Sequence, residues 1–334
     1  MTDKSKFDFS RRGLLKAGGA AGLVASTPAF FMRNAWAANF RNDPGDASSI
    51  KLGFNVPQTG PYSEEGKDEL RAYKLAVKHL NGEGDGGMLN TFKPSSLTGN
   101  GVLGKKVEYA TGDTQTKSDA ARASAKRLIE KEKVLMITGG SSSGVAVAVQ
   151  SLCQEEGVIF MAGLTHSNDT TGKDKRRYGF RHFFNAYMSG RALGPVLEKE
   201  YGKERRAYHL TADYNWGWTQ EESIKNTTEE LGWQTAATVK TPVGAGDFSQ
   251  YITPVLNSGA DVLILNHYGK DMINSLSQAV QFGLREKQVN GKNFEIVVPL
   301  FSRLMAQGAG DSIKGILGTT NWNWSLQDEA LKPS

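Results

Sequence analysis

The sequence predicts an α/β fold built from two doubly wound parallel-sheet lobes, and two observations support this prediction. Short apolar runs alternate with amphipathic helical stretches from Ile50 onward. The pattern is interrupted by a charged stretch at 173–177 and then restarts, which places a crossover near residues 182–186. Strands that alternate with helices in this way form parallel sheets that are covered on both faces.

The first unit is predicted to hold four β–α units in a lobe at residues 48–183. Its first helix carries apolar residues on one face, as at Leu70, Tyr73 and Val77. A polar, glycine-rich stretch at 82–104 is predicted to be a surface loop or insertion. The predicted strands are 50–56, 106–109, 134–138 and 158–162, and the predicted helices are 68–80, 117–132 and 143–156.

The second unit repeats the alternation in a lobe at residues 184–318. Gly283 follows an apolar helical stretch, and glycine readily takes the left-handed conformation that ends a helix. The predicted strands are 206–210, 234–239, 262–265 and 294–298, and the predicted helices are 191–201, 218–231, 248–256 and 272–282.

The first 37 residues have the pattern of an export signal. SRRGLLK at 10–16 resembles the twin-arginine motif, a mildly apolar stretch follows at 17–31, and Ala35-Trp36-Ala37 offers small residues to a signal peptidase. Glycines and a proline within the apolar stretch make a membrane anchor the weaker interpretation. We therefore expect recognition by the twin-arginine export machinery, cleavage after Ala37 and a periplasmic mature protein.

Charge and cysteine usage narrow the classes of partner. The formal charge is +5, but the 1–37 segment holds six basic and two acidic residues, a net +4, so the remainder carries about +1. This near neutrality argues against nucleic acid and anionic lipid as partners. The single cysteine, Cys153, lies in an apolar helical stretch and is predicted to be a buried structural thiol.

A glycine- and serine-rich turn at 139–144 is the first candidate binding element. It follows a predicted buried strand and opens a predicted helix, a place where backbone N–H groups bind anions. Ser141, Ser142 and Ser143 would add three hydroxyls suited to a carboxylate or another polar anion. An ordinary serine N-cap is the structural alternative.

The same turn also supports an enzyme hypothesis. GSSSG at 140–144 matches the G-x-S-x-G nucleophile elbow, and Asp213 and His267 follow in the chain order of an α/β-hydrolase triad. A secreted serine hydrolase using Ser142, Asp213 and His267 is thus an alternative, which predicts esterase activity that is lost in Ser142→Ala.

Other chemistry is not indicated by the sequence. The five histidines lack the spacing of metal ligands, and the glycine pairs do not continue into a nucleotide-binding fingerprint. We therefore expect no cofactor and no metal. Aromatic residues recur after predicted strands, either as pocket walls or as the edge of the core: Tyr62, Trp216, Trp218, Tyr268, Trp322 and Trp324.

Four motifs in order resemble the leucine/isoleucine/valine-type periplasmic solute-binding proteins, the type I family of ABC importers. They are IKLGFNVPQTGPYSEEG at 50–66, the serine turn with EGVIFMAGLT at 156–165, DYNWG at 213–217 and DFSQYITPVLNSGADVLIL at 247–265. The likeness runs from about residue 50 to 324. It implies two α/β lobes with a ligand cleft between them, which close on one solute.

The resemblance also implies roles for individual residues. The three serines match the loop that holds a ligand's carboxylate, and Leu164 with Thr165 matches the opposing loop. Trp216 and Tyr268 match aromatic walls of the second lobe. Glu65 falls where the first loop often has an aromatic residue, with Tyr62 nearby.

One departure from the family concerns the ligand. Amino-acid binders of this family place a glutamate after the strand that ends near Val298, where it meets the ligand's ammonium, but this sequence has Phe301. Burying an ammonium without a carboxylate costs several kcal/mol. The sequence thus points to an aromatic or keto carboxylate or an amide, unless Glu64 or Glu65 replaces the missing partner.

A second departure concerns the end of the chain. The family returns to lobe 1 after a segment like 318–324, so residues 319–334 are expected to be the crossover back to a lobe 1 that is truncated. The function that the resemblance implies is capture of a small carboxylate, amide or amino acid, and delivery to an ABC transporter permease without catalysis. A binding subunit of a chemosensory receptor is a further alternative, and a monomer is expected.

Overall fold

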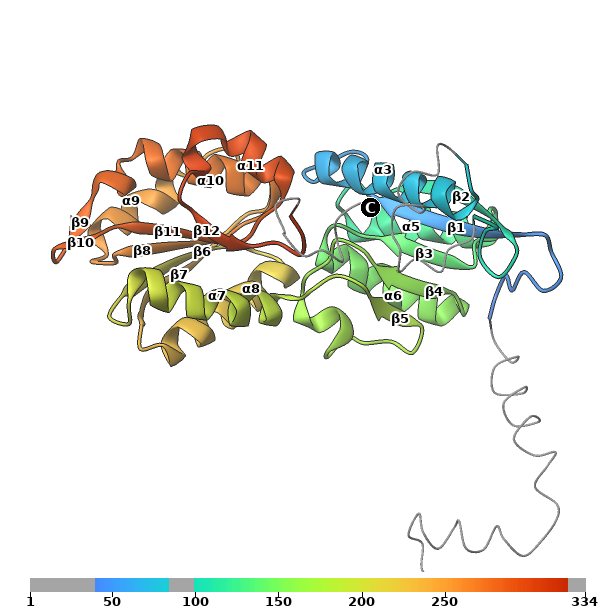
Figure 1. Cartoon of the computed structure of the whole chain (residues 1–334), viewed down its shortest axis with the longest axis horizontal. Helices are drawn as coiled ribbons and strands as arrows, with labels where there is room; N and C mark the ends of the chain where they lie inside the picture. The colour runs from blue at the N-terminus through green and yellow to red at the C-terminus, as the bar shows by residue number, and fades with distance from the viewer. Residues whose placement is uncertain (1–39, 84–98, 324–334) are drawn as a thin grey trace, which may run out of the picture. The chain divides into compact units, whose positions relative to one another are not determined.

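The computed structural model describes residues 40–83 and 99–323, which form two α/β lobes (Figure 1). Lobe 1 contains a parallel sheet in the order β2-β1-β3-β4-β5, and lobe 2 a parallel sheet in the order β12-β11-β8-β6-β7. The predicted fold class is therefore confirmed. The predicted export signal at 1–37 lies outside the described residues, as do 84–98 and Trp324.

Helices cover both faces of the lobe 1 sheet. Phe54 and Val56 of β1 pack against α3, whereas Ile137 of β3 and Phe160 of β4 pack against α5 and α6. The strands are β1 (Ser49–Val56), β2 (Lys106–Asp113), β3 (Met136–Gly139), β4 (Ile159–Ala162) and β5 (Gly179–Arg181), and the helices are α3 (Ser63–Leu80), α5 (Ser118–Glu130), α6 (Ser143–Glu156) and the short η1 (Asn168–Thr171).

Lobe 2 has the same layered build, with α9, α10 and α11 on one face and α7 and α8 on the other (Figure 1). The strands are β6 (Arg206–Ala212), β7 (Gln234–Thr241), β8 (Val262–Asn266), β11 (Glu295–Leu300) and β12 (Leu317–Thr319). The helices are α7 (Ala186–Tyr201), α8 (Asn215–Glu230), α9 (Ser249–Asn257), α10 (Gly269–Gln281) and α11 (Arg303–Ala309), with short turns η2 (Leu284–Glu286) and η3 (Gly310–Ile313) and the hairpin β9 (Gln288–Val289) and β10 (Lys292–Asn293).

Four helices begin three or more residues earlier than the periodic pattern predicted. Helix α7 begins at Ala186 where position 191 was expected, after the segment that crosses between the lobes, and the other three follow strand ends. Helix α3 begins at Ser63 where position 68 was expected, α8 at Asn215 where 218 was expected, and α10 at Gly269 where 272 was expected. Their first turns are rich in polar and glycine residues and therefore lack the apolar periodicity that marks the rest of each helix. These first turns lie at the carboxyl edges of the two sheets, where α/β folds bind ligands.

In the part of the chain that the structure describes, no helix has both the length and the apolar character that crossing a bilayer requires. The predicted burial of Cys153 is confirmed, and burial raises the pKa of its thiol to about 12.

Candidate functional site

The serine loop, residues Gly139–Ser143, connects the end of β3 to α6. Gly139 and Gly140 have φ angles of 125° and 115°, and Ser141 has a φ of 40°. A side chain at Gly139 would approach the backbone oxygen of Asn55 to 2.5 Å, so this position requires glycine. Ser141, Ser142 and Ser143 are all buried. Ser142 stands at the N-cap of α6, but its side chain makes no capping hydrogen bond.

Glu69, in the second turn of α3, accepts hydrogen bonds from the loops at this edge of lobe 1. Ser141 Oγ donates to its Oε2 at 2.5 Å, and the backbone N–H of Leu164 donates to its Oε1 at 3.2 Å. The hydroxyl of Tyr73 donates to Oε1 at 2.5 Å. Burial raises the pKa of Glu69, and the three hydrogen bonds oppose that rise because they stabilise the charged carboxylate.

Sequence reasoning missed Glu69. It precedes Tyr73 by one helical turn, and Tyr73 belongs to the predicted apolar face of the same helix. That spacing is the signal that a carboxylate lies at the border of the buried face.

The loop after β4 lies against the serine loop, as expected. The backbone N–H of Ser167 donates to Ser143 Oγ at 3.1 Å, which joins the two loops. Thr165 is buried, its carbonyl oxygen accepts from Arg181 Nη1 at 2.6 Å, and its hydroxyl has no hydrogen-bond partner among the described residues. Burial and the nearby Arg181 charge lower the pKa of the adjacent His166 to about 3, so this imidazole is neutral at physiological pH.

Three of the predicted aromatic residues come together in one cluster. The ring centroids of Tyr62 and Tyr268 are 5.4 Å apart, and those of Trp216 and Tyr268 are 6.2 Å apart. Tyr214 joins them at 6.1 Å from Tyr62. Trp216 Nε1 is buried and has no hydrogen-bond partner among the described residues, whereas the hydroxyl of Tyr62 interacts with that of Tyr214. Tyr62 comes from lobe 1 and the others from lobe 2, so the cluster joins the two lobes.

A cavity of about 210 Å³ is lined by residues of both lobes. Four of the predicted site residues line it, namely Glu65, Leu164, Tyr268 and Phe301. Phe183, Leu300 and Trp322 add apolar surface from the segments that cross between the lobes. Ser141, Ser142, Ser143, Thr165, Tyr62 and Trp216 do not line it.

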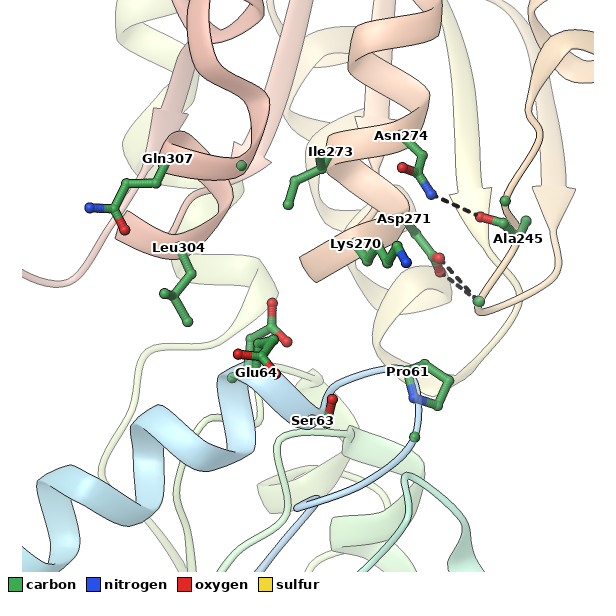
Figure 2. A pocket seen from close by; sticks show the side chains of 15 residues that line it. Pro61, Ser63, Glu64, Ala245, Lys270, Asp271, Ile273, Asn274, Leu304 and Gln307 are labelled. Carbon is green, nitrogen blue, oxygen red and sulfur yellow. Dashed lines mark hydrogen bonds between the residues drawn. The ribbon is translucent and has the colours of Figure 1, made fainter.

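A second cavity, of about 890 Å³, adjoins the start of α3 (Figure 2). Pro61, Ser63 and Glu64 come from lobe 1, whereas Lys270 and Asn274 come from α10 of lobe 2. Leu304 and Gln307 of α11 complete one side. Glu65 lines this cavity as well as the smaller one, so its carboxylate stands at the boundary of the two.

Two buried carboxylates of the cavity walls have different surroundings. Asp271 accepts hydrogen bonds from the backbone N–H of Gly244 at 3.0 and 2.9 Å, and burial raises its pKa to about 6 (Figure 2). Glu65 forms no ion pair with a described residue, and its carboxylate accepts a hydrogen bond from its own backbone N–H. Burial raises its pKa, and this hydrogen bond opposes the rise. A Cβ at Gly269 would lie 2.8 Å from Glu65 Oε1, so the glycine makes room for this carboxylate.

The hydrolase triad is not assembled, and that interpretation was wrong. The two ring nitrogens of His267 contact Thr241 Oγ1 at 2.9 Å and Ser275 Oγ at 2.8 Å. Asp213 contacts Trp218 and Lys240. Burial lowers the pKa of His267 to about 3, which makes it a poor general base at neutral pH.

Among the residues that the structure describes, no group of three or more histidine, cysteine or acidic side chains has a geometry that would hold a metal ion.

Comparisons with known proteins agree with this architecture. Residues 49–332 match a family model described as periplasmic binding protein. A Leu/Ile/Val-binding protein homolog 7 from Brucella suis biovar 1 (strain 1330) is 25% identical over 252 residues, which are 73% of this chain and 59% of that relative. The chain thus spans less than two thirds of the length of this relative.

Solved structures show the same fold at low sequence identity. A periplasmic binding protein from Burkholderia mallei is 23% identical with a TM-score of 0.72, covering 85% of this chain and 69% of that one. A leucine-binding protein from Thermotoga maritima MSB8 is 23% identical with a TM-score of 0.64, over 82% and 70% of the two chains. An R. palustris solute-binding protein of an ABC transporter, in complex with 4-hydroxybenzoate, is 23% identical with a TM-score of 0.66, over 80% and 67%.

Proposed function

The chain belongs to the periplasmic binding protein family, and from this premise we propose that it captures a small organic solute between its lobes and delivers it to an ABC transporter permease. The mature protein acts in the periplasm as a monomer, after export by the twin-arginine machinery and cleavage after Ala37. We assign lobe 1 to residues 48–183, lobe 2 to 184–318, and the crossover back to lobe 1 to residues 319–334, of which 324–334 lie outside the described residues.

The observation that carries this proposal is the pair of cavities with walls from both lobes. Ligands of open α/β sheets bind beyond the carboxyl ends of the strands. The first turns of α3 and α10 stand at such ends, in lobe 1 and lobe 2 respectively, and both line the larger cavity. A solute held there contacts both lobes at once, which is the requirement for a ligand that stabilises a closed form.

The mechanism is capture without a chemical step. A ligand shifts the balance between open and closed forms only to the extent that it binds the closed form more tightly. Contacts to Leu164 and Glu65 on lobe 1 and to Tyr268 and Phe301 on lobe 2 form together only when the lobes meet. The closed form then docks on the permease, and ATP hydrolysis in the transporter drives release.

Relatives support an organic solute of modest size. The R. palustris neighbour holds 4-hydroxybenzoate, and the Brucella relative is named for leucine, isoleucine and valine. The smaller cavity, at about 210 Å³, exceeds the 150 Å³ of an engineered protein cavity that accepts benzene, so it has room for one ring with a small polar group.

Mass spectrometry of small molecules released from the purified protein tests the proposal. We expect one bound solute, whose re-addition to the stripped protein gives a saturable heat of binding in isothermal titration calorimetry. Tyr268→Ala and Phe301→Ala should each weaken that binding about tenfold or more, because both rings line the smaller cavity and aromatic groups carry much of the binding energy in such pockets. Tyr109→Ala, a partly exposed aromatic of β2 outside the site, should leave it unchanged. Failure of a broad panel of organic acids, amides and amino acids to bind would contradict the proposal.

A further inference from the structure

We propose that the site selects a solute that presents N–H donors, such as an amide, amidine or amine, and disfavours a solute with a free carboxylate at the serine loop. This inference rests on the proposed function and narrows its ligand class. It follows from three arrangements of hydrogen-bonding groups: the commitment of Ser141 to Glu69, the unpaired carboxylate of Glu65, and the apolar walls of the smaller cavity.

The first arrangement concerns the direction of the Ser141 hydroxyl. A serine hydroxyl has one proton to donate, and Ser141 donates it to Glu69 Oε2 at 2.5 Å. The oxygen of Ser141 is left with lone pairs only, and it can therefore accept from a ligand but not donate to it. The backbone N–H of Leu164, in the opposing loop, is also committed to Glu69, at 3.2 Å.

The second consequence of Glu69 is electrostatic. Its side chain is buried beside the serine loop and accepts three hydrogen bonds, which favour its carboxylate form against the rise in pKa that burial causes. A ligand carboxylate placed against the same loop would meet a like charge in a region of low dielectric constant. Two carboxylates at one such site do not both stay ionised without a large cost. The serine loop therefore disfavours a ligand carboxylate, which it would bind if Glu69 were absent.

The unpaired carboxylate of Glu65 supplies the attractive part. Glu65 is only 5% exposed and lines both cavities; its carboxylate accepts from its own backbone N–H but has no ion-pair partner among the described residues. A buried charge without a partner is costly, and a ligand N–H or cation relieves that cost. Asp271 does not compete for this role because the backbone N–H of Gly244 already occupies both its oxygens.

The cationic side chains near the cavities do not neutralise the carboxylate of Glu65. Arg303 lines the smaller cavity but lies 3.7 Å from Asp68, its ion-pair partner. Lys270 lines the larger cavity from an exposed position, where solvent screens its charge. Glu65, the buried acceptor that lines both cavities, therefore dominates recognition of the polar group.

The apolar walls indicate what carries that group. Leu164, Phe183, Tyr268, Phe301 and Trp322 surround the smaller cavity. Aromatic side chains at these positions suit a flat or compact apolar body. The predicted ligand combines such a body with one nitrogen-bearing head group directed at Glu65.

Isosteric probes separate the alternatives. Benzamidine, benzamide and benzoate share a shape and carry charges of +1, 0 and −1 at pH 7. Leucinamide and leucine form an aliphatic pair that differs at the carboxylate. Titration calorimetry of the full chain should show binding at least tenfold tighter for benzamidine or benzamide than for benzoate, or for leucinamide than for leucine.

Single-residue variants test whether Glu65 and Glu69 cause the preference for nitrogen-bearing probes. Glu65→Gln should weaken binding of the favoured probe about tenfold. Glu155→Gln is the control, because Glu155 of α6 is exposed, pairs with Arg122 at 3.3 Å and lines neither cavity, and it should change nothing. Glu69→Gln should shift the ratio of affinities toward the carboxylate probe by about tenfold. Thermal melting of each variant establishes that it is folded.

The outcomes distinguish this inference from the proposed function. Tighter binding of benzoate or leucine than of the matched nitrogen probes, with loss in Ser141→Ala, would overturn the inference and leave solute capture standing. Equal affinities within each series would also overturn it. If no solute of any class binds, the proposed function fails, and the inference fails with it.

Discussion

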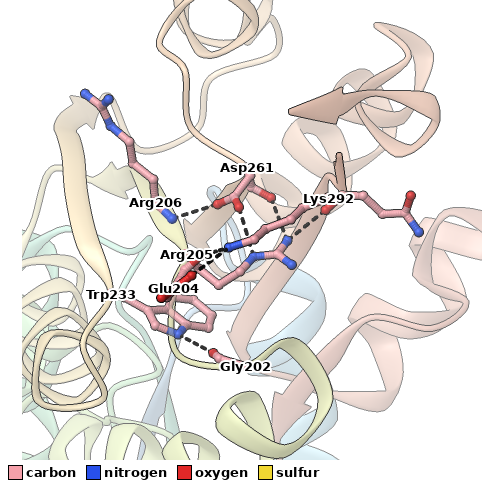
Figure 3. Close-up of polar contacts among 8 residues, drawn as sticks. Gly202, Glu204, Arg205, Arg206, Trp233, Asp261 and Lys292 are labelled. Carbon is pink, nitrogen blue, oxygen red and sulfur yellow. Dashed lines mark hydrogen bonds and ion pairs between the residues drawn. The ribbon is translucent and has the colours of Figure 1, made fainter. Parts of the chain in front are cut away.

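A buried ion pair in lobe 2 allows a stability prediction to be worked out in detail. Arg205 and Asp261 have side chains that are 6% and 7% exposed, and Arg205 Nε lies 3.1 Å from Asp261 Oδ2 (Figure 3). Asp261 Oδ1 accepts from the backbone N–H of Arg206 at 2.7 Å. Arg205 Nη2 donates to the carbonyl oxygens of Asp261 and Asn293, at 3.1 and 2.7 Å. The pair thus joins the start of β6, the start of β8 and the β9–β10 hairpin.

Asp261→Ala should lower the free energy of unfolding by about 3–5 kcal/mol, because it leaves a buried guanidinium without a counter-charge. It also leaves the N–H of Arg206 without its acceptor, and an unsatisfied buried group costs about 1–3 kcal/mol. Asp261→Asn keeps an oxygen for that N–H and removes only the charge, so it should cost less than Asp261→Ala. Adding Arg205→Met to Asp261→Ala should recover part of the loss, since the unpaired charge is gone.

Urea unfolding at pH 7, followed by tryptophan fluorescence, measures these differences. Glu230→Ala is the control, because it breaks an ion pair with Arg191 whose side chains are 63% and 50% exposed. Exposed pairs contribute about 0–1 kcal/mol, and Glu230→Ala should stay in that range. A loss below about 1 kcal/mol for Asp261→Ala, the range of an exposed pair, would refute the reasoning from burial.

Three other predictions concern titration, backbone fit and reactivity. Burial lowers the pKa of His267 to about 3, so its unfolded form binds a proton below about pH 6.5 while the folded form does not. Stability should therefore fall as pH decreases from 6.5 toward 3. His267→Gln should reduce the loss of stability between pH 7.0 and pH 5.5 by about 1.3 kcal/mol in urea titrations; an unchanged loss would argue against a buried neutral imidazole. Gly66→Ala would place a Cβ 1.9 Å from the Pro57 carbonyl oxygen and should lower the free energy of unfolding by about 2 kcal/mol or more in the same urea assay. In Gly144→Ala the new Cβ meets nothing within 4 Å, so that variant should be neutral or more stable. Cys153 should not react with a thiol reagent in the native protein but should react fully in denaturant, and rapid native labelling would contradict its burial.

Much of the fold followed from apolar periodicity, and the failures have a common physical cause. The two residues that connect β9 to β10, Asn290 and Gly291, have φ angles of 52° and 76°. Both values are positive, as a type I′ turn requires. An Asn-Gly pair is the sequence signal for such a hairpin, but its strands have two residues each and show no alternation. Helix α11 is missed for a similar reason, since its seven residues are too few to establish a periodic face.

Site residues that lie at turns after strands could be predicted from sequence motifs. Site residues whose role depends on packing between elements could not. Tyr62, Trp216 and Tyr268 follow strand ends, and their common cluster is consistent with parallel strands that end at one edge. Glu69 lies inside a helix, and only the three-dimensional contact with Ser141 and Leu164 reveals its role. A single sequence does not distinguish such a buried glutamate from the solvated ones beside it.

Small-angle X-ray scattering with and without a bound solute tests the central claim most directly. The account predicts that the radius of gyration decreases when the solute identified by mass spectrometry, or the tightest probe of the isosteric series, saturates the protein. The same titration on Tyr268→Ala should require a higher concentration to reach the compact form, because Tyr268 lines the smaller cavity. A radius of gyration that stays unchanged at saturation, for a solute whose binding calorimetry has established, would contradict capture by lobe closure.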